Sequence, residues 1–372
     1  MTYIHQMLVS KELGGAGLIG IHLASFLRAK KHGYCLWIPG EGAALHKIQQ
    51  LALKFSTYDA SCVFHASKMR AAVGNWKIWR NFCPYRPGIV HIHSPYHYKA
   101  LQTGLQMSRL KTVVHVHLQE AEGGLRWAFE KPPDVIVTCA RTLADHVRHT
   151  LPVRYQERQR IISVPNAIDV ERFAPGDKAT AKQRIGAPSN IPLVLMVANL
   201  APHKGQETAI RAMASLKRTG VAVVCWLAGV ERQGRRDYTT RLQKLCNELG
   251  VADRVRFLEH REDVPDLLRA ADIFLLPSTS EGLPLSVLEA QATKVPVLAA
   301  PTAGIPEVVV DGETGFLIPA EDAVGYAHRI ASLLNQPGIS HCISEQAYIK
   351  IIKEHNWQRY CENIFLLYQS LI

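Results

Sequence analysis

Residues 277–317 read PSTSEGLPLSVLEAQATKVPVLAAPTAGIPEVVVDGETGFL, and their pattern decides the fold of the second half of the chain. The apolar run that leads into them, Ala271–Pro277, is bounded by turn signals and predicts a buried strand of a parallel sheet. The chain then breaks over Ser278–Gly282. A helix is expected to begin near Pro284, because proline is favoured in the first helical turn. The stretch therefore predicts the strand, loop and helix of an open α/β sheet.

Two carboxylates in this stretch, Glu281 and Glu289, lie eight positions apart. Glu281 is predicted in the loop at the carboxyl end of the strand, where open α/β sheets bind ligands, and Glu289 about one turn into the helix. The free N–H groups at the helix start suit a diphosphate, and each carboxylate can accept hydrogen bonds from adjacent hydroxyls of a sugar or a ribose. The alternative is that both are ordinary helix-start acids stabilised by the helix dipole. Their spacing alone leaves both interpretations open.

Short apolar runs alternate with helical stretches along the whole chain. This alternation predicts two doubly wound α/β domains with parallel sheets. Between the two sets, Asn166–Gly176 has little periodicity and contains Pro175-Gly176, and we place the hinge there. The expected strands lie near residues 4–9, 35–38, 89–93, 113–117 and 135–138 in the first domain, and near 193, 223–228, 255–258, 273–276, 297–299 and 315–318 in the second.

Segments spread over nearly the whole chain resemble, in the right order, those of the retaining glycosyltransferases of family 4. They are Leu13–Gly17, Val113–His117, Val164–Pro175, Val194–Gly205, Trp226–Gly229, Arg254–Leu258, Ser278–Ala290, Pro296-Val297, Gly304–Val309 and Asp311–Gly315. The resemblance implies the GT-B architecture, two Rossmann-like domains that face each other across a cleft. It implies an acceptor-binding domain at 1–168, a nucleotide-sugar domain at 169–350, and a last helix within 351–372 that crosses back to the first domain.

The resemblance places the activated sugar mainly on the second domain. It implies that Lys204, Gly15 and the helix start at Gly282 and Leu283 hold the diphosphate, that Glu281 holds the sugar hydroxyls, and that Glu289 holds the ribose. The family usually has an arginine before its phosphate loop, where this chain has Asn199. Asparagine donates hydrogen bonds without charge, so part of the stabilisation of the leaving nucleotide is missing. His203 and Arg261 are the candidate substitutes; without one, the chain is expected to be slow or non-catalytic.

His117 is predicted at the end of a strand, where a neutral imidazole can hydrogen-bond the donor sugar. The resemblance assigns it to the catalytic site together with Glu281 and Lys204. His91, His93 and His115 also lie on strands, but no carboxylate or cysteine completes a ligand set at a recognisable spacing. We therefore predict no metal site and no cofactor. The nucleotide-diphosphate sugar is a co-substrate, and the cations and the helix start carry its charge.

The positive charge of the chain lies in its first half. Residues 1–180 contain 23 Lys and Arg against 12 Asp and Glu, whereas the remainder contains 20 of each. Within residues 68–86, basic residues alternate with aromatic ones, which suits an anionic bilayer surface. The alternatives are a nucleic-acid partner and a solvated helix that buries its aromatics. The candidate membrane-surface residues are Lys68, Arg70, Trp76, Lys77, Trp79 and Arg80.

The rest of the composition points to an intracellular protein. Eight cysteines are scattered without a CxxC pair, which argues against a disulfide framework and suits a reducing compartment. The N-terminus has no basic region followed by a long apolar core, and no apolar run approaches about 18 residues. We expect a cytoplasmic protein that binds peripherally to the inner face of the membrane.

The function expected from the sequence is transfer of a sugar, with retention of configuration, from a nucleotide-diphosphate sugar to a hydroxyl of a glycan or lipid-linked acceptor. Uridine diphosphate is the carrier expected from the family. Two alternatives stay open, a non-catalytic GT-B subunit of a glycan assembly and a nucleotide-sugar epimerase. A nucleic-acid-binding protein is disfavoured, because it leaves the segment from Glu281 to Glu289 unexplained. The sequence does not identify the donor sugar or the acceptor.

Overall fold

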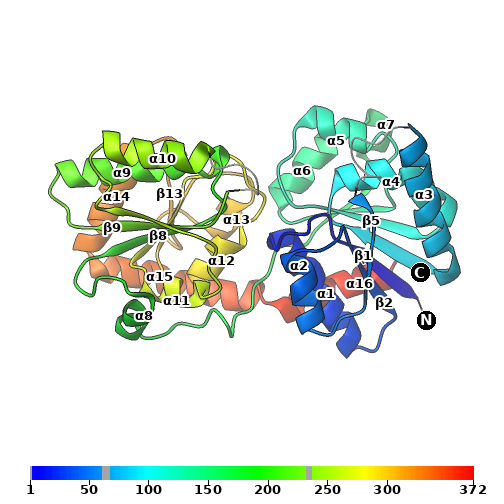
Figure 1. Ribbon diagram of the computed structural model, residues 1–372, viewed down its shortest axis with the longest axis horizontal. Helices are drawn as coiled ribbons and strands as arrows, with labels where there is room; N and C mark the ends of the chain where they lie inside the picture. The colour runs from blue at the N-terminus through cyan, green and yellow to red at the C-terminus, as the bar shows by residue number, and fades with distance from the viewer. Residues whose placement is uncertain (1, 61–67, 232–236) are drawn as a thin grey trace. The chain divides into compact units, whose positions relative to one another are not determined.

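The computed structural model describes residues 2–60, 68–231 and 237–372, and the chain divides into two compact units (Figure 1). Unit 1 comprises Met1–Asn166 and Trp357–Ile372, and unit 2 comprises Ala167–Asn356. The boundaries expected from the sequence lie at 168/169 and 350/351, whereas the two units divide at 166/167 and 356/357.

Unit 1 is built on a parallel sheet in the order β3-β2-β1-β4-β5-β6-β7. Its strands are β1 (Tyr3–Met7), β2 (Tyr34–Ile38), β3 (Phe55–Thr57), β4 (Gly88–Ile92), β5 (Lys111–Val116), β6 (Val135–Thr138) and β7 (Arg160–Ser163). Its helices are α1 (Gly15–Ala29), α2 (Ala43–Gln50), α3 (Lys68–Phe82), the 3-10 turn η2 (Cys83–Tyr85), α4 (Pro95–Ser108), α5 (Glu122–Ala128), α6 (Arg141–Thr150), α7 (Val153–Gln156) and α16 (Trp357–Gln369). The central strands are buried on both faces, which explains why most of their residues are apolar.

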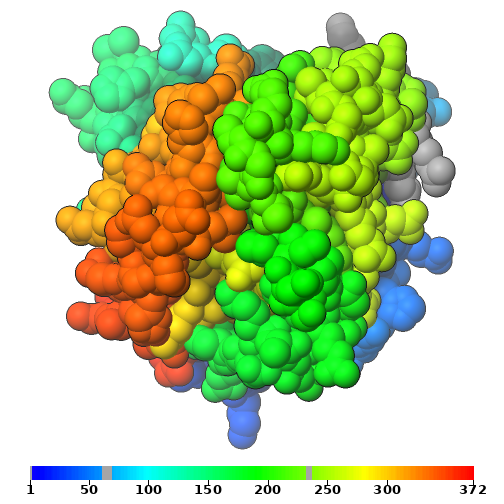
Figure 2. All heavy atoms as spheres, turned by 90° about the vertical axis from the view of Figure 1, so that its left-hand side faces the viewer, coloured from blue at the N-terminus to red at the C-terminus, as the bar shows by residue number. Residues whose placement is uncertain are grey.

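Unit 2 has a second parallel sheet, in the order β10-β9-β8-β11-β12-β13. Its strands are β8 (Leu193–Val197), β9 (Val224–Ala228), β10 (Val255–Leu258), β11 (Ile273–Leu276), β12 (Val297–Ala299) and β13 (Phe316–Leu317). Its helices are α8 (Lys178–Ile185), η3 (Pro202–Lys204), α9 (Gln206–Arg218), α10 (Asp237–Glu248), α11 (Val264–Ala270), α12 (Leu285–Ala292), α13 (Ile305–Val308), α14 (Ala323–Asn335) and α15 (Pro337–Glu354). Figure 2 shows a face of this unit, on which α14, in orange, packs beside α9, in green.

The prediction of two doubly wound α/β domains is confirmed, and the expected strands coincide with observed ones to within a few residues. Strands β3 and β7 were not predicted. β3 has only three residues, none of them buried, and β7 is an edge strand with no fully buried residue. Neither segment has the continuous apolar run that marks a central parallel strand, so pattern alone does not reveal them.

The last helix, α16, packs in unit 1 although it follows unit 2 in the sequence. The indole of Trp357 at its start stacks on His22 of α1, with ring centroids 4.2 Å apart. Tyr368 near its end is fully buried. These contacts make α16 a structural part of unit 1 and bring its polar groups to the central strands of that unit.

Candidate functional site

The sheet of unit 2 reverses its winding direction between β8 and β11. From β8 the chain adds β9 and β10 on one side, and from β11 it adds β12 and β13 on the other. Ligands of open α/β sheets bind outside the carboxyl ends of the strands at such a switch point. The loop after β8 carries Asn199 and Lys204, and the loop after β11 carries Glu281. The topology therefore brings these two loops to one place.

Lys204 and Glu281 form a close ion pair at this switch point. The Nζ atom of Lys204 lies 2.7 Å from Oε1 and 2.8 Å from Oε2 of Glu281. The Glu281 side chain is 3% exposed and the Lys204 side chain 17%. A carboxylate this deeply buried needs a compensating charge, and Lys204 supplies it. Two of the three residues expected to be catalytic thus meet in unit 2.

The main chain holds the two loops together around this pair. The Thr279 N–H donates to the His203 carbonyl at 2.8 Å, and the Ser278 hydroxyl donates to the Lys204 carbonyl at 3.3 Å. Gly205, directly after Lys204, has φ +80°, and a Cβ atom there would lie 2.0 Å from the Pro277 carbonyl oxygen. Only glycine allows this approach. The position of Lys204 therefore depends on close backbone packing between the loops.

Helix α12 begins beside the same loop, at Leu285, after Pro284 as its N-cap. The helix start predicted near Pro284 is confirmed. No side chain caps its first turn, so its free N–H groups suit an anion. The preceding residues Gly282 and Leu283 are buried, and the Gly282 carbonyl accepts a hydrogen bond from the Gly304 N–H at 2.7 Å. The helix start is therefore fixed in position.

Glu289 is the fifth residue of α12 and is half-buried. Burial raises the pKa of its carboxyl from 4.5 to about 7, and the positive charge of Arg172 opposes this shift. Within the described parts of the chain, no hydrogen-bond partner of the carboxyl group is found. Glu289 thus differs from Glu281, whose charge Lys204 compensates.

Arg261, one of the two candidate substitutes for the family's arginine, is paired with a neighbouring acid in this structure. Its Nε donates to Asp263 Oδ1 at 2.7 Å, and this contact lowers the pKa of the Asp263 carboxyl. The charge of Arg261 is thus already compensated. Asn199 is exposed, and its carbonyl accepts a hydrogen bond from the Gln206 amide at 3.0 Å. His203 is exposed directly before Lys204.

In unit 1, Gly15 is the first residue of α1, and no side chain caps this helix. The N–H groups of its first turn can therefore meet an anion, as expected for a glycine loop that follows a strand. Gly14, the N-cap, is extended rather than left-handed, with φ −94° and ψ 178°.

His117 lies directly after β5, and His93 directly after β4. Nδ1 of His93 is 3.1 Å from Nε2 of His117. Both imidazoles are desolvated, which lowers the pKa of His93 to about 3 and that of His117 well below its usual range. Both rings are therefore neutral at physiological pH.

Ring nitrogens of His91, His93 and His115 lie within 4.8 Å of one another, as ligands of one metal ion do. However, the His91 and His93 rings are nearly parallel, with centroids 4.5 Å apart and an interplanar angle of 20°. A metal ion bound to an imidazole lies close to the ring plane, so two stacked rings cannot share one without rotating. Both nitrogens of His93 also take part in hydrogen bonds. This geometry does not suit a metal site.

The buried polar residues Gln6 and Tyr368 contact this histidine cluster and did not emerge as candidates from the sequence. The available signal was a glutamine in the middle of an apolar strand, Tyr3–Met7. A polar side chain in a central parallel strand needs a hydrogen-bond partner.

Helix α3 carries the basic and aromatic residues of the predicted membrane surface. Met69, Val73 and Trp76 are 76%, 43% and 49% exposed, and they follow one another at helical spacing. Lys77 and Arg80 are exposed beside them, and the Arg80 guanidinium lies 5.4 Å from the centre of the Trp76 ring. Arg70 is also exposed, whereas Trp79 is half-buried on the side that packs on the unit. The side chain of Lys68 lies outside the described parts of the structure.

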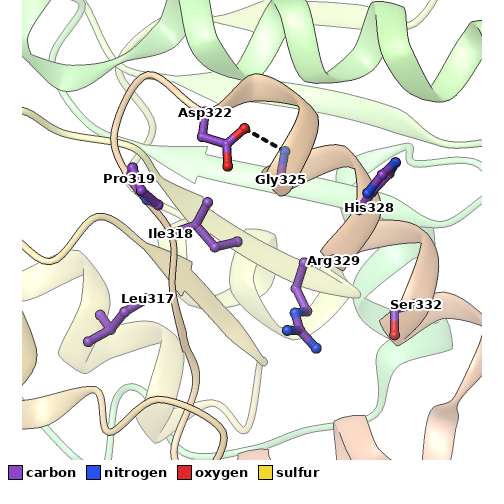
Figure 3. A pocket seen from close by; sticks show the side chains of 8 residues that line it. All are labelled: Leu317, Ile318, Pro319, Asp322, Gly325, His328, Arg329 and Ser332. Atoms are coloured by element: carbon purple, nitrogen blue, oxygen red, sulfur yellow. Dashed lines mark hydrogen bonds between the residues drawn. The ribbon is translucent and has the colours of Figure 1, made fainter.

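A hollow of about 440 Å³ lies elsewhere in unit 2, between the end of β13 and α14 (Figure 3). Its lining includes Arg329 and also Asp322, which caps α14 by accepting from the Gly325 N–H. None of the predicted site residues lines it. The candidate site is therefore defined by the loops after β8 and β11 rather than by this hollow.

Comparison with known proteins gives matches over both halves of the chain. The family described as Glycosyl transferases group 1 matches residues 177–350, and Glycosyltransferase Family 4 matches residues 13–172. A D-inositol 3-phosphate glycosyltransferase 2 from Catenulispora acidiphila is 36% identical over 185 residues, 48% of this chain and 43% of that protein. A D-inositol 3-phosphate glycosyltransferase from Acidothermus cellulolyticus is 32% identical over 248 residues, 64% of this chain and 55% of that protein. The chain spans about half the length of these curated relatives.

Among solved structures, HepE from Anabaena in complex with UDP-glucose matches with a TM-score of 0.86 and 21% identity, over 100% of both chains. Sucrose-phosphate synthase from Thermosynechococcus elongatus matches with a TM-score of 0.83 and 20% identity, over 100% of this chain and 99% of that one. At such identities the likeness establishes the fold. The fold is thus of the GT-B type, and each half of the chain is similar to a glycosyltransferase family.

Proposed function

We propose that this chain transfers a sugar, with retention of configuration, from a uridine-diphosphate sugar to a hydroxyl of a glycan or lipid-linked acceptor at an anionic membrane surface. The observation that carries the proposal is the buried Lys204–Glu281 pair at the switch point, beside the uncapped start of α12. An ammonium, a carboxylate and free N–H groups are the three kinds of group that a nucleotide sugar requires.

Each group has a separate task in this proposal. Lys204 and the N–H groups of α12 hold the diphosphate and stabilise the negative charge that develops on the leaving nucleotide. Glu281 accepts hydrogen bonds from the sugar hydroxyls, and Glu289 accepts them from the ribose. From unit 1, we propose that Gly15 contributes to diphosphate binding and His117 to binding of the donor sugar. No step requires a metal ion or a cofactor.

The relatives support a nucleotide-sugar donor. HepE is described in complex with UDP, with UDP and glucose, and with UDP-glucose. The curated relatives are named for glycosyl transfer to inositol 3-phosphate. A uridine carrier is therefore the first choice for this chain. The alignments cover only about half of the curated relatives, so they do not identify its acceptor.

The proposal is tested by measuring the thermal stability of the protein with UDP, GDP and ADP sugars. We expect one nucleotide sugar to stabilise the wild type, because a ligand that binds only the folded state raises its stability. The Lys204→Ala and Glu281→Ala variants should lose that stabilisation, whereas Lys217→Ala should retain it, because Lys217 pairs with Asp253 on the surface of the same unit. Equal stabilisation of all four proteins would place the donor elsewhere.

A non-catalytic GT-B subunit is the second candidate, and Asn199 favours it. Where the family has an arginine, this residue carries no charge, and Arg261 is already paired with Asp263. Lys204 is then the cation that we propose at the diphosphate. Binding of a radiolabelled donor with neither transfer nor hydrolysis would support this second candidate, and release of the free nucleotide would rule it out.

The raised pKa of Glu289 predicts that both the affinity for UDP and the stability of the free protein depend on pH. If the carboxylate binds the ribose hydroxyls, the affinity for UDP should rise by about tenfold per pH unit below 7 and level off above it, since the ionised form is the stronger acceptor. Conversely, the free protein should lose stability from this group as the pH rises from 4.5 to about 7, because the folded state holds the proton more tightly than the unfolded state.

Calorimetric titration with UDP and urea unfolding between pH 5.5 and 8.5 measure these two effects. The Glu289→Gln variant is the control, since it keeps the size of the side chain and removes the titration. The ionisation of UDP itself contributes equally to both proteins. A wild-type profile that coincides with the Glu289→Gln profile would contradict the assigned role.

The exposed face of α3 predicts binding to anionic vesicles. Trp76→Ala should weaken binding to the vesicles about tenfold, because it removes an aromatic ring that would insert into the surface of the bilayer. The Lys77→Glu, Arg80→Glu double variant should weaken it further, because each basic group contributes about 1 kcal/mol near an anionic surface. Vesicle co-sedimentation at low and high salt measures both effects.

Trp127→Ala is the matched control, since Trp127 is 54% exposed on α5 of the same unit. Binding that depends on Trp127 as much as on Trp76 would contradict the role of α3. Displacement of the vesicles by an oligonucleotide would favour the nucleic-acid alternative. Among the described residues, no helix is both long and apolar enough to cross a bilayer.

A further inference from the structure

A continuous chain of side-chain hydrogen bonds connects α16 to His117 through the core of unit 1. The Gln6 amide nitrogen lies 2.5 Å from the Tyr368 hydroxyl, and the Gln6 amide oxygen lies 3.0 Å from His93 Nε2. His93 Nδ1 lies 3.1 Å from His117 Nε2. On the other side, the Tyr368 hydroxyl lies 2.6 Å from His91 Nδ1. Gln6, His91 and His93 are at most 3% exposed.

The donors and acceptors in this chain follow one direction. In the orientation that the Gln6 amide has in the structure, its oxygen faces His93 and can only accept, so Nε2 of His93 carries the proton and donates it. Since the His93 ring is neutral, its Nδ1 is an acceptor. Nε2 of His117 must therefore donate to it. Tyr368 accepts from the Gln6 amide nitrogen and donates its own proton to Nδ1 of His91.

The ring geometry supports a hydrogen bond between His93 and His117. Their planes differ by 15° and their centroids are 5.3 Å apart, while the two nitrogens are 3.1 Å apart. Two imidazoles that meet edge to edge in one plane have such a separation, and their N–H bond and lone pair then point along the line between them. A neutral imidazole that donates from Nε2 keeps its remaining lone pair on Nδ1.

We propose that Gln6 and His93 are positioning residues that hold His117 with its proton on Nε2, so that His117 Nδ1 accepts a hydrogen bond from a substrate hydroxyl. Nδ1 of His117 is a buried atom that has no hydrogen-bond partner among the described residues. The identity of that hydroxyl as part of a sugar rests on the proposed function. The tautomer itself does not, because it is set within unit 1.

The tautomer has a direct chemical consequence. A lone pair on Nδ1 selects a group that donates, namely a hydroxyl, and not a fluorine or a hydrogen at the same carbon. A proton on Nδ1 would select acceptors instead. Donor analogues in which single sugar hydroxyls are replaced by fluorine should therefore include one whose kcat/KM falls about tenfold, and His117→Ala should abolish the difference between that analogue and the parent donor.

The tautomer is measured by two-bond proton–nitrogen correlation spectra on the full chain labelled with ¹⁵N-histidine, with His117→Gln used for assignment. We expect one dominant Nε2–H form of His117 in the wild type. Gln6→Met, which keeps the size of the side chain but removes the acceptor, should produce a mixture of both tautomers and lower kcat about fivefold, since one hydrogen bond contributes about 1 kcal/mol. The affinity for UDP should remain unchanged, because the variant leaves the loops of unit 2 intact.

Matched variants separate this role from a purely structural one. Tyr368→Phe removes the hydroxyl that orients the Gln6 amide and should act in the same direction, and it replaces Gln6→Met if that variant does not fold. Tyr360→Phe, on the same helix, removes a buried hydroxyl that has no partner in the described parts of the chain and should change neither the spectrum nor the rate. Gln102→Met removes a buried glutamine that bonds the Lys131 carbonyl and should leave His117 unchanged.

His117 with its proton on Nδ1 in the wild type, or an unchanged spectrum in both Gln6→Met and Tyr368→Phe, would overturn the proposal. Neither observation requires substrate, so a protein that transfers no sugar still gives a decisive spectrum. Conversely, an active enzyme with the Nδ1–H form would leave the proposed function intact and reject only the positioning role.

Discussion

Replacing Lys204 by methionine should lower kcat/KM for sugar transfer by about 10²–10³-fold, the usual effect of removing one group that stabilises charge in a transition state. The same change leaves the Glu281 carboxylate buried without a counter-ion, because only 3% of that side chain is exposed. Breaking a buried pair in this way typically costs about 3–5 kcal/mol of stability. Transfer kinetics and amide hydrogen exchange in β8 and β11 measure the two effects separately.

The double variant Lys204→Met, Glu281→Gln distinguishes the structural role from the chemical one. It replaces the ion pair by two neutral side chains, so it should regain much of the stability but none of the activity. Lys217→Met is the surface control and should change stability by less than about 0.5 kcal/mol. Full activity in the stabilised double variant would exclude Lys204 and Glu281 from the reaction.

Replacing Gly205 by alanine should destabilise unit 2 by about 3 kcal/mol or more. Part of the cost is the left-handed conformation, φ +80°, which alone costs a residue with a side chain about 1–2 kcal/mol. The larger part is the clash of the new Cβ, 2.0 Å from the Pro277 carbonyl oxygen. Since Gly205 follows Lys204, relief of the clash must separate the two loops and weaken nucleotide binding as well.

Gly186→Ala is the matched control for this prediction. Gly186 ends α8 with a similar φ of +70°, but nothing lies within 4 Å of a Cβ atom there. It should therefore cost only the conformational part, about 1 kcal/mol. Hydrogen exchange of β8 and β11 reports both variants in the same unit. Equal losses for the two would show that backbone conformation, rather than packing of the loops, governs this position.

Much of the fold was predictable because central parallel strands are buried on both faces. Ile273–Leu276 and Val297–Ala299 coincide with predicted strands, since each is a short apolar run between turn signals. The start of α12 was predictable from Pro284 for a local reason, the fixed φ of proline. β3 and β7 were not, because exposed or edge strands lack that apolar pattern.

The candidate site was predictable only in part. Lys204 and Glu281 follow two strands that the sequence identifies, but their contact requires β8 and β11 to be neighbours, which the strand order determines. The pairing of Arg261 with Asp263 depends on side-chain conformation, so it was not visible in the residue pattern. The same holds for Trp79, which is half-buried while Trp76 is exposed.

The sequence by itself determined the two doubly wound domains, the loop between β11 and α12, and the residue types available for binding a nucleotide sugar, because these follow from local pattern. Only the tertiary structure decided that Lys204 compensates Glu281 at the switch point and that Gln6 and Tyr368 bond to the histidines beside His117. The reason is physical. A hydrogen bond or ion pair between residues 77 or 362 positions apart exists only after the sheet order and the return of α16 have brought them within 3 Å.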